Sequence, residues 1–294
     1  MGPGGWRLDL GELATVREFD QRFAAARRQR WQAWQATAAS WADDPRLVAY
    51  FPIHSQFDMS QRMVPSLGRT AGLANALAVG PVGSSQGRFG EFTSALSFER
   101  AGARLRTRID GELSALTLSC WVRIDSLQNR YNALFMADGY ENGEPHWQIR
   151  DDGRIMFSVM VDDSQVVEFF NERDRRVVRD AGLHRIYLTP PVWNPDDSGQ
   201  WMHLAAVYDP NQRRVRQYVN GAMVADEEIP PRLLVRTLRI GAAEIGNWGQ
   251  PFRQTPWFAV RNLDGAIDEM WVLDAALESA EIQRLYEQGK PLGF

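Results

Sequence analysis

The acidic residues of this 294-residue chain lack the spacing that cleavage of a glycosidic bond requires. A retaining glycosidase places two carboxylates about 5 Å apart in one cleft, and a strand supplies such a pair from alternate positions. Asp268 and Glu269 are neighbours, so a regular strand would point them to opposite faces. The acidic pairs at 151–152 and 162–163 stand beside turn residues, where we expect solvated carboxylates. The acidic residues therefore do not favour a hydrolase.

The other side chains that could support catalysis are also dispersed. His54, His146, His184 and His203 have no metal-ligand spacing, and the chain has no Gly-x-Ser-x-Gly elbow and no glycine-rich phosphate loop. For His203, which lies in a strand-like segment, we expect a hydrogen bond in the core. Cys120, the single cysteine, lies on the apolar side of another such segment and should be an inert buried thiol. We therefore expect no enzyme activity, and a polysaccharide-active enzyme is kept as an alternative.

The aromatic residues indicate binding. The chain has 11 tryptophans, and an indole ring stacks on the apolar face of a sugar while amide, carboxylate and guanidinium groups bond its hydroxyls. Two long segments, 138–147 and 244–262, carry both kinds of residue, and connections of this length are usually functional or disordered. The candidate ligand-binding residues are Asp138, Tyr140, Trp147, Glu244, Asn247, Trp248, Trp257, Arg261 and Asn262. The alternative is that Trp147 and Trp248 fill the mouth of a sandwich as core residues.

The segments that position these loops are predicted to be short antiparallel strands. Apolar and polar residues alternate over 116–124, 155–161 and 202–208, and a period of two is typical of a strand with two different faces. Asn220-Gly221 follows one such run and suits a tight hairpin turn, because both residues tolerate positive φ. The chain is therefore predicted to be all-β, with two antiparallel sheets that form a jelly-roll sandwich over about residues 47–273.

Helices are predicted at both ends of the chain. Between Val16 and Trp41 the apolar residues recur at helical steps, and the helix should end at Pro45, because a residue before proline avoids the α region. We divide the chain into a linker-helix region, 1–45, and a jelly-roll domain, 46–294, closed by a short helix over Ala275–Gln288. The linker helix should pack on the sandwich or continue from an upstream domain, and an amphipathic helix at a membrane surface is the alternative.

Four segments follow one another in a characteristic order. They are Gly-x-Trp-x-His with a hydrophobic run at 199–209, Tyr-Val-Asn-Gly at 218–221, Leu-Arg-Ile-Gly at 238–241 and Asp-Gly-Ala-Ile-Asp-Glu at 264–269. In this order they resemble the laminin-G-like, or concanavalin A-like, jelly-roll family, and the resemblance covers about residues 47–292. It implies a fold that is used mostly for binding and that only some branches use for catalysis.

Further stretches narrow the resemblance. Segments 47–51, 135–140, 144–149 and 243–248 are similar to the C-terminal part of planctomycete-type FecR-domain proteins, in which a membrane helix and a FecR domain precede a laminin-G-like domain outside the membrane. The resemblance implies a non-catalytic, periplasmic or otherwise extracytoplasmic recognition module. Its partner would be a glycan or a protein, and any membrane contact would be made by a missing N-terminal region.

Two further expectations concern the partner and the cofactor. A purely structural or protein–protein interaction domain of such a signalling protein is the alternative function, and a net charge of −4 does not favour nucleic acid. No cofactor is expected except one structural calcium, which the resemblance implies near the first and last strands, with Asp58, Asp264 and Asp268 as ligands. The alternative is that Asp264 belongs to a turn and that Asp268 caps a segment or pairs with an arginine.

Overall fold

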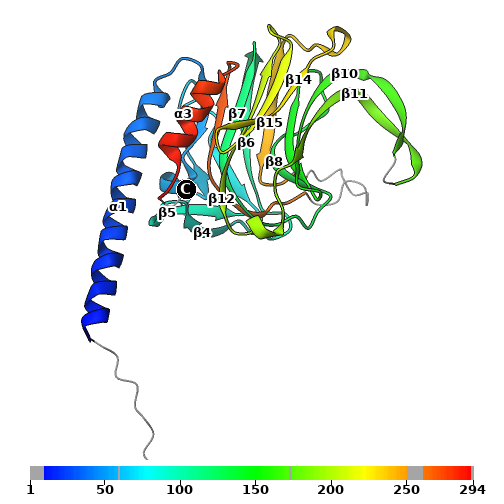
Figure 1. Cartoon of the computed structure of the whole chain (residues 1–294). Helices are drawn as coiled ribbons and strands as arrows, with labels where there is room; N and C mark the ends of the chain where they lie inside the picture. The colour runs from blue at the N-terminus through cyan, green and yellow to red at the C-terminus, as the bar shows by residue number, and fades with distance from the viewer. Residues whose placement is uncertain (1–9, 59, 172–173, 250–260, 293–294) are drawn as a thin grey trace, which may run out of the picture.

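The computed structural model describes residues 10–58, 60–171, 174–249 and 261–292, and two antiparallel sheets form its centre (Figure 1). Sheet A has the strand order β14-β13-β12-β7-β16-β5-β4, and β1 also pairs with β16. Its strands are β1 (Leu47–Phe51), β4 (Gly83–Gly87), β5 (Gly90–Ser97), β7 (Leu116–Ser126), β12 (Trp201–Asp209), β13 (Arg214–Val219), β14 (Ala222–Glu228) and β16 (Asp264–Leu273).

Sheet B has the strand order β11-β10-β9-β8-β15-β6-β3-β2. Its strands are β2 (Met63–Val64), β3 (Ala76–Val79), β6 (Arg104–Leu113), β8 (Tyr131–Ala137), β9 (Pro145–Arg150), β10 (Arg154–Asn171), β11 (Arg176–Pro191) and β15 (Leu238–Ile245). Two short 3₁₀ turns, η1 (Pro195–Asp197) and η2 (Pro231–Leu233), lie between strands. The predicted all-β jelly-roll sandwich is therefore confirmed.

The alternating residues of the strands build the core between the sheets. On β7, Leu118, Cys120 and Val122 are fully buried and pack in one hydrophobic cluster with Phe157 of β10 and Leu204 of β12. Burial raises the pKa of the Cys120 thiol well above its ordinary value, because it disfavours the thiolate. The expected burial of this thiol on the core face of its strand is confirmed.

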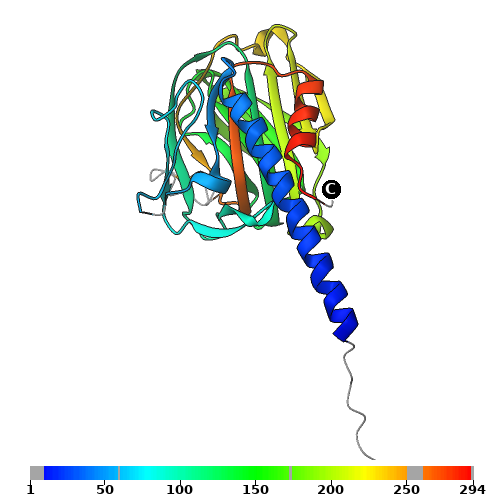
Figure 2. The ribbon, with the colours of Figure 1, turned by 90° about the vertical axis from the view of Figure 1, so that its left-hand side faces the viewer.

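Two helices cover the outer face of sheet A (Figure 2). Helix α1 (Leu10–Ala42) lies against this face with its C-terminal half, through Trp31, Trp34 and Trp41, which belong to a second hydrophobic cluster with residues of sheet A. The N-terminal half of the helix projects beyond the sandwich. No helix within the described residues is both long enough and apolar enough to cross a membrane.

Helix α3 (Ser279–Gly289) packs beside α1 and buries Ile282 and Leu285. It begins later than the predicted residue 275, because the side chains of Glu278 and Glu281 form a capping box that fixes the first turn at Ser279. A short helix, α2 (Ile53–Gln56), follows β1.

The hairpin of β10 and β11 is longer than the sheet to which it belongs. Strand β9 pairs with β10 only from Ile155 to Val159, whereas β10 and β11 remain paired as far as Asn171 and Arg176. We call the two-stranded part, 162–171 and 176–183, the arm. Register shifts after Met160 interrupt the pairing where the arm begins, and such irregularities bend a strand pair. The arm consequently leaves the plane of the sheet, arches outwards and bends back at its end (Figure 1).

Candidate functional site

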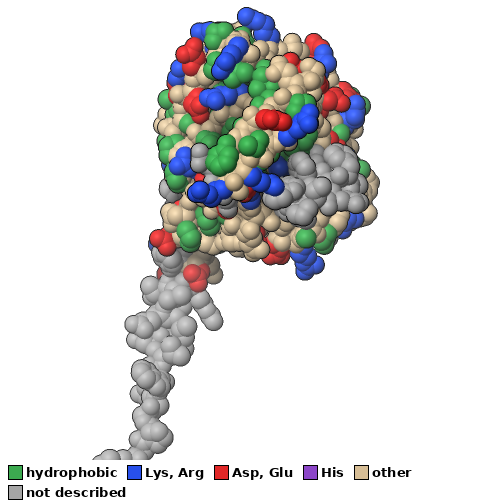
Figure 3. All heavy atoms as spheres, turned by 90° about the vertical axis from the view of Figure 1, so that its right-hand side faces the viewer, with side chains coloured by type: hydrophobic (Ala, Val, Ile, Leu, Met, Phe, Trp, Pro, Cys, Tyr) green, Lys and Arg blue, Asp and Glu red, His purple; other side chains and the backbone are tan. Residues whose placement is uncertain are grey.

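A groove of about 620 Å³ lies between the outer face of sheet B and the arm. Figure 3 shows this face of the molecule, on which arginine side chains surround a hollow. The residues that line the groove come from β8, β9, β10, β11 and the loops beside them. They are Asn129, Arg130, Tyr131, Tyr140, His146, Gln148, Met156, Ser158, Met160, Phe169, Asn171, Asp174, Arg176, Val177, Val178, Arg179, Asp180, His184, Ile186 and Arg261.

The floor of the groove consists of the strand positions that do not face the core. On β9, His146 and Gln148 line the groove, whereas Trp147 between them is fully buried in the core. The register pairs His146 with Ser158 of β10, and Gln148 with Met156 of the same strand. Because side chains alternate along a strand, one face of each strand stabilises the sandwich and the other provides a polar floor.

Arg261 is held at the floor by aromatic rings and an amide. Its Nη1 donates to Oε1 of Gln148 at 3.1 Å, and its guanidinium carbon lies 4.7 Å from the ring centroid of Tyr131 and 4.5 Å from that of Trp248. Tyr140 stands next to this group, with its ring edge-on to those of Trp248 and His146 at 5.3 Å. The floor therefore presents an aromatic ring beside a fixed cation.

The arm forms the opposite wall and contributes charged residues. Nη1 of Arg130 lies 2.8 Å from Oδ2 of Asp174, at the far end of the arm. Nε2 of His184 lies 3.3 Å from Oδ2 of Asp180. Each of these carboxylates thus has a basic partner, and the ion pair of Arg130 ties the arm to the sandwich.

Of the nine predicted ligand-binding residues, Tyr140 and Arg261 line the groove. Trp147 is core, as the alternative interpretation held, because it occupies the inward position of β9. Trp248 is 1% exposed and lies beneath the groove, where its Nε1 donates to the carbonyl oxygen of Ala137 at 2.9 Å. Trp257 lies outside the described residues.

Four other predicted polar residues do not line the groove and bond to other parts of the protein. Glu244 is fully buried and accepts hydrogen bonds from Nε of Arg104 at 2.8 Å and from the backbone N–H of Gly249 at 2.8 Å. Burial raises the pKa of its carboxyl group, although the backbone bond and nearby arginines act against this. Asp138 pairs with Arg106, whose Nη2 lies 2.6 Å from its Oδ2. This network anchors the loop that follows β15.

Asn247 and Asn262 fix the two ends of that loop. Asn247 is fully buried, and its Oδ1 accepts a hydrogen bond from the backbone N–H of Trp248. Nδ2 of Asn262 donates to the carbonyl oxygens of Phe98 and Glu99 at 3.2 and 3.1 Å. Asp138, Glu244, Asn247 and Asn262, which were predicted to meet the ligand, do not line the groove, and their polar groups bond to other parts of the protein.

Several groove residues were not predicted from the sequence, although the alternation along β10 indicates where their side chains face. The alternation of Ile155, Phe157 and Val159 predicts the core face of β10, and the intervening Met156 and Ser158 must then face the other side. The long loops were predicted to form the binding surface, whereas the floor is a strand face. The arm residues carry no such signal, because their position depends on the bend after Met160.

The three predicted calcium ligands do not converge. Asp58 is partly exposed, and its Oδ1 accepts hydrogen bonds from the backbone N–H groups of Ser60 and Gln61. Asp264 accepts hydrogen bonds from Ser126 and Gln128. Asp268 is fully buried and pairs with an arginine, as the alternative interpretation held. Within the described residues, these three aspartates do not form a group whose ligand atoms lie within 4.8 Å of one another.

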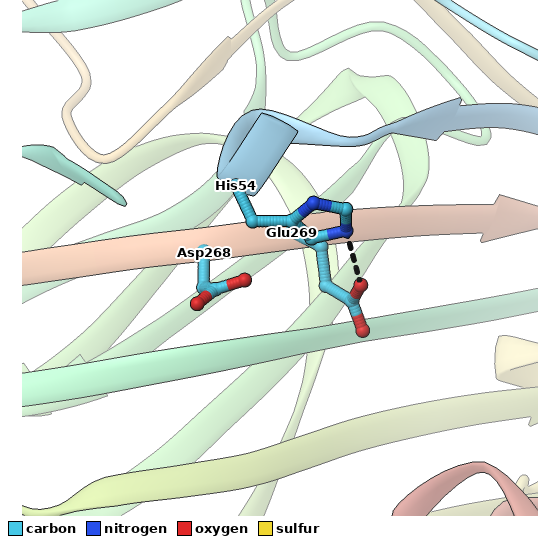
Figure 4. Close-up of side chains that lie close together, drawn as sticks. All are labelled: His54, Asp268 and Glu269. Carbon is cyan, nitrogen blue, oxygen red and sulfur yellow. Dashed lines mark ion pairs between the residues drawn. The ribbon is translucent and has the colours of Figure 1, made fainter. Parts of the chain in front are cut away.

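Asp268 does lie in a different cluster, with His54 and Glu269 (Figure 4). Their candidate ligand atoms lie within 4.8 Å of one another, but Arg88 takes the place that a cation would need. Its Nη1 lies 2.5 Å from Oδ1 of Asp268, and its Nη2 lies 3.1 Å from Oε1 of Glu269. A guanidinium that already neutralises the carboxylates makes this cluster an ion-pair network and a poor metal site.

The same network corrects the prediction that adjacent acidic residues point to opposite faces. Both Asp268 and Glu269 reach Arg88, although they are neighbours on β16. The pairing of β16 with β7 shifts register between Ile267 and Glu269. Such a bulge places two residues of one strand opposite a single partner, so the period of two is lost at this point.

Glu269 also provides a testable pH dependence. Burial alone would raise the pKa of its carboxyl, but Arg88 and the hydrogen bond from His54 lower this pKa to about 2, from an ordinary 4.5. The stability that Glu269 contributes is therefore complete above about pH 5 and is lost as the pH falls from 4.5 towards 2, by roughly 3 kcal/mol. For Asp268 the net shift is opposite, because burial raises the pKa of this carboxyl more than the attraction of Arg88 lowers it.

The measurement compares the free energy of unfolding of the wild type with that of Glu269→Gln at several pH values. The difference between the two proteins should shrink between pH 5 and pH 2, because the amide does not titrate. The subtraction removes the contribution of the carboxylates that do not interact with Glu269. A difference that stays constant over this range would contradict the prediction.

His203 has the core role that its strand position predicts. Its Nε2 lies 2.8 Å from Oγ of Ser119 on the neighbouring strand β7, and burial lowers the pKa of the imidazole to about 3. A neutral, hydrogen-bonded imidazole in this place stabilises the sheet and is remote from the groove lining.

The fold and the groove define a class of protein: a jelly-roll β-sandwich with an open site on the outer face of one sheet. The chain belongs to the concanavalin A-like lectin/glucanases superfamily, whose family model matches residues 100–283. The match covers β6 to α3 and includes the groove. The resemblance to a laminin-G-like domain is confirmed at this level.

Two curated relatives match part of the chain. Pappalysin-1 of Mus musculus is 33% identical over 145 residues, and pappalysin-1 of Homo sapiens is 32% identical over the same length. Each alignment covers 45% of this chain, which spans only 8% of the length of these relatives. The similarity therefore concerns one region of a much larger protein.

Solved structures share the fold at low sequence identity. Domain 4 of AbnA, an extracellular arabinanase from Geobacillus stearothermophilus solved with arabinotriose, has a TM-score of 0.52 and 19% identity, over 82% of this chain and 98% of that domain. A structure of botulinum neurotoxin type C has a TM-score of 0.54 and 10% identity, over 86% of this chain and 53% of that one. At such identities, the likeness establishes the fold alone.

Proposed function

We propose that the protein is a non-catalytic recognition module whose groove binds a carbohydrate. The observation that carries this proposal is the floor, where the Tyr140 ring stands beside Arg261, Gln148 and His146. An aromatic ring with forked polar groups around it suits a sugar, which has an apolar face and a rim of hydroxyls. The volume of about 620 Å³ is in the usual range for a ligand site.

The fold neighbours are consistent with this function. The arabinanase domain was solved in complex with arabinotriose, and botulinum neurotoxin type C depends on interaction with two ganglioside molecules when it enters cells. These ligands belong to those proteins. They support the proposal because they indicate that the same fold can hold a carbohydrate.

The absence of catalysis is part of the same proposal. The groove is lined by two carboxylates, those of Asp174 and Asp180, and each has a basic partner in Arg130 or His184. A general acid needs a raised pKa and a second carboxylate across the scissile bond. The carboxyl whose pKa burial does raise nearby, Glu244, is fully buried beneath the surface.

Replacement of Tyr140 by alanine should weaken glycan binding about tenfold, because an aromatic contact contributes about 1–1.5 kcal/mol. A glycan array first selects a ligand for the wild-type protein, and calorimetric titration then gives the affinity of each variant. Trp201→Ala is the matched control, since this aromatic residue lies on β12 of sheet A and does not line the groove. Binding that is equally strong in both variants, or an array with no bound glycan, would refute the proposal.

A protein partner is the second candidate, and the arm favours it. Val166 and Phe170 are 54% and 53% exposed and do not line the groove. Exposed apolar side chains on a two-stranded ribbon are typical of an interaction surface. Phe170→Ser separates the candidates, because it changes this surface and leaves the groove lining unaltered. We also propose an extracytoplasmic location and a FecR-type signalling context for the protein.

A further inference from the structure

The groove has a charge opposite in sign to that of the whole chain. Four arginines and two aspartates line it, which leaves an excess of two positive charges, whereas the net charge of the chain is −4. The arginines are Arg130, Arg176, Arg179 and Arg261. Positive charge concentrated in a concave surface attracts an anionic ligand more strongly than the same charges on a convex one.

Arg261 has the environment of an anion-binding group. It is only partly exposed, and its described contacts are the amide oxygen of Gln148, the side chain of Tyr140 and aromatic rings. Asp180 attracts it from a distance, but none of the described carboxylates lies within ion-pair distance of its guanidinium. Burial lowers the pKa of this guanidinium, which still stays protonated at neutral pH. A buried charge without a counter-charge is costly, and a bound anion would offset that cost.

Arg179 provides a second positive group on the opposite wall. It is exposed, it lines the groove from β11, and within the described part of the chain no ion-pair partner lies within 4.0 Å of it. Arg130, by contrast, is neutralised by Asp174. Two positive groups without a described ion pair thus lie on opposite sides of the groove, Arg261 at the floor and Arg179 on the arm.

We infer that the ligand is an acidic glycan, whose carboxylate or sulfate is held by Arg261 while a sugar ring contacts Tyr140. This inference rests on the proposed function and narrows it to a class of ligand. The guanidinium is planar and offers parallel N–H donors, which fit two oxygens of a carboxylate or a sulfate at once. Because rings and an amide already fix the group, little conformational entropy is lost when the anion binds.

The experiment uses the full chain and a glycan array. The array contains three matched sets of the same lengths, which are oligogalacturonates, sulfated oligogalactosides and neutral oligogalactosides. It also contains a broad set of other neutral and acidic glycans. We expect the protein to bind one of the acidic sets at least about tenfold more tightly than the neutral set. The set of acidic glycans that binds, galacturonates or sulfated galactosides, shows whether the site recognises a carboxylate or a sulfate. Binding of neutral glycans with equal strength overturns the inference and leaves the proposed function intact, whereas an array without any bound glycan overturns both.

Variants test whether Arg261 holds the anionic group of the glycan. Arg261→Gln should weaken binding of the acidic glycan by about 10- to 100-fold, the effect of a lost charge-assisted hydrogen-bond pair, and change neutral binding far less. Arg108→Gln is the control, because this arginine is exposed on β6 and does not line the groove. Arg179→Gln repeats the test at an exposed position if Arg261→Gln fails to fold. Unchanged acidic binding in folded Arg261→Gln and Arg179→Gln overturns the inference.

Discussion

Replacement of Arg88 by methionine should lower the free energy of unfolding by about 3–5 kcal/mol, because it leaves two buried carboxylates without their counter-charge. Arg88 is 4% exposed and lies in the turn between β4 and β5. Its backbone N–H and Nη1 donate to Asp268, and its Nη2 pairs with Glu269. Its Nε donates to the carbonyl oxygen of Gly289 at the end of α3, so one side chain joins sheet A to a helix.

Methionine is the informative replacement because it keeps most of the volume of the side chain and removes only the charge and the donors. The guanidinium lies over the rings of Phe89, Trp121 and Trp34, at 4.6, 5.1 and 5.2 Å from their centroids. A thioether retains favourable contacts with aromatic rings, so little of the loss can come from packing. Chemical denaturation followed by tryptophan fluorescence measures the change.

Arg27→Met provides the matched control. Arg27 also makes an ion pair with a glutamate, Glu91, but at 3.4 Å and with both side chains more than a third exposed. Exposed pairs contribute about 0–1 kcal/mol, so this variant should stay close to the wild type. Equal losses in the two variants would mean that burial of the Arg88 network does not determine its contribution.

This network also marks where sequence reasoning stopped. The alternation of Leu118, Cys120 and Val122 sufficed to predict sheets with a buried face, because a period of two is a local property of the chain. The contact of Arg88 with Asp268 joins residues 180 positions apart and depends on the bulge in β16. Neither the contact nor the bulge has a local signature in the sequence. The sequence therefore predicted that Asp268 and Glu269 point to opposite faces, and it gave no sign that both pair with Arg88.

The groove illustrates the same limit in a different form. The sequence indicated that tryptophans in long loops would stack on sugar, yet Trp147 and Trp248 are core and support residues. Tyr140 and Arg261 were identified because they belong to the same loops, and both line the groove. Residue type alone does not separate a platform from a core ring. The face of the strand on which a residue lies does separate them. Because alternate residues face opposite sides, this criterion would have assigned Gln148 to the groove and Trp147 to the core.

Replacement of Trp34 by alanine should lower the free energy of unfolding by about 3–5 kcal/mol, a typical loss for a buried tryptophan. Trp34 is 1% exposed on helix α1, and its ring packs edge-on against Trp271 of β16 at 6.1 Å. Its Nε1 donates to Oε2 of Glu269 at 3.1 Å, so the variant also removes one donor from the buried carboxylate. Trp34→Phe should recover part of the loss, because it restores packing without the donor.

Gln35→Ala is the control, since this residue is exposed on the same helix and glutamine and alanine are both good helix formers. The comparison decides how the chain divides into units. The sequence predicted a linker helix outside a jelly-roll domain that begins at residue 46, whereas Trp31, Trp34 and Trp41 share one cluster with Trp271. If α1 is an integral part of the domain, Trp34→Ala lowers the midpoint of a single cooperative transition. If it is a separable linker, the sandwich unfolds in Trp34→Ala at the same midpoint as in the wild type and in Gln35→Ala.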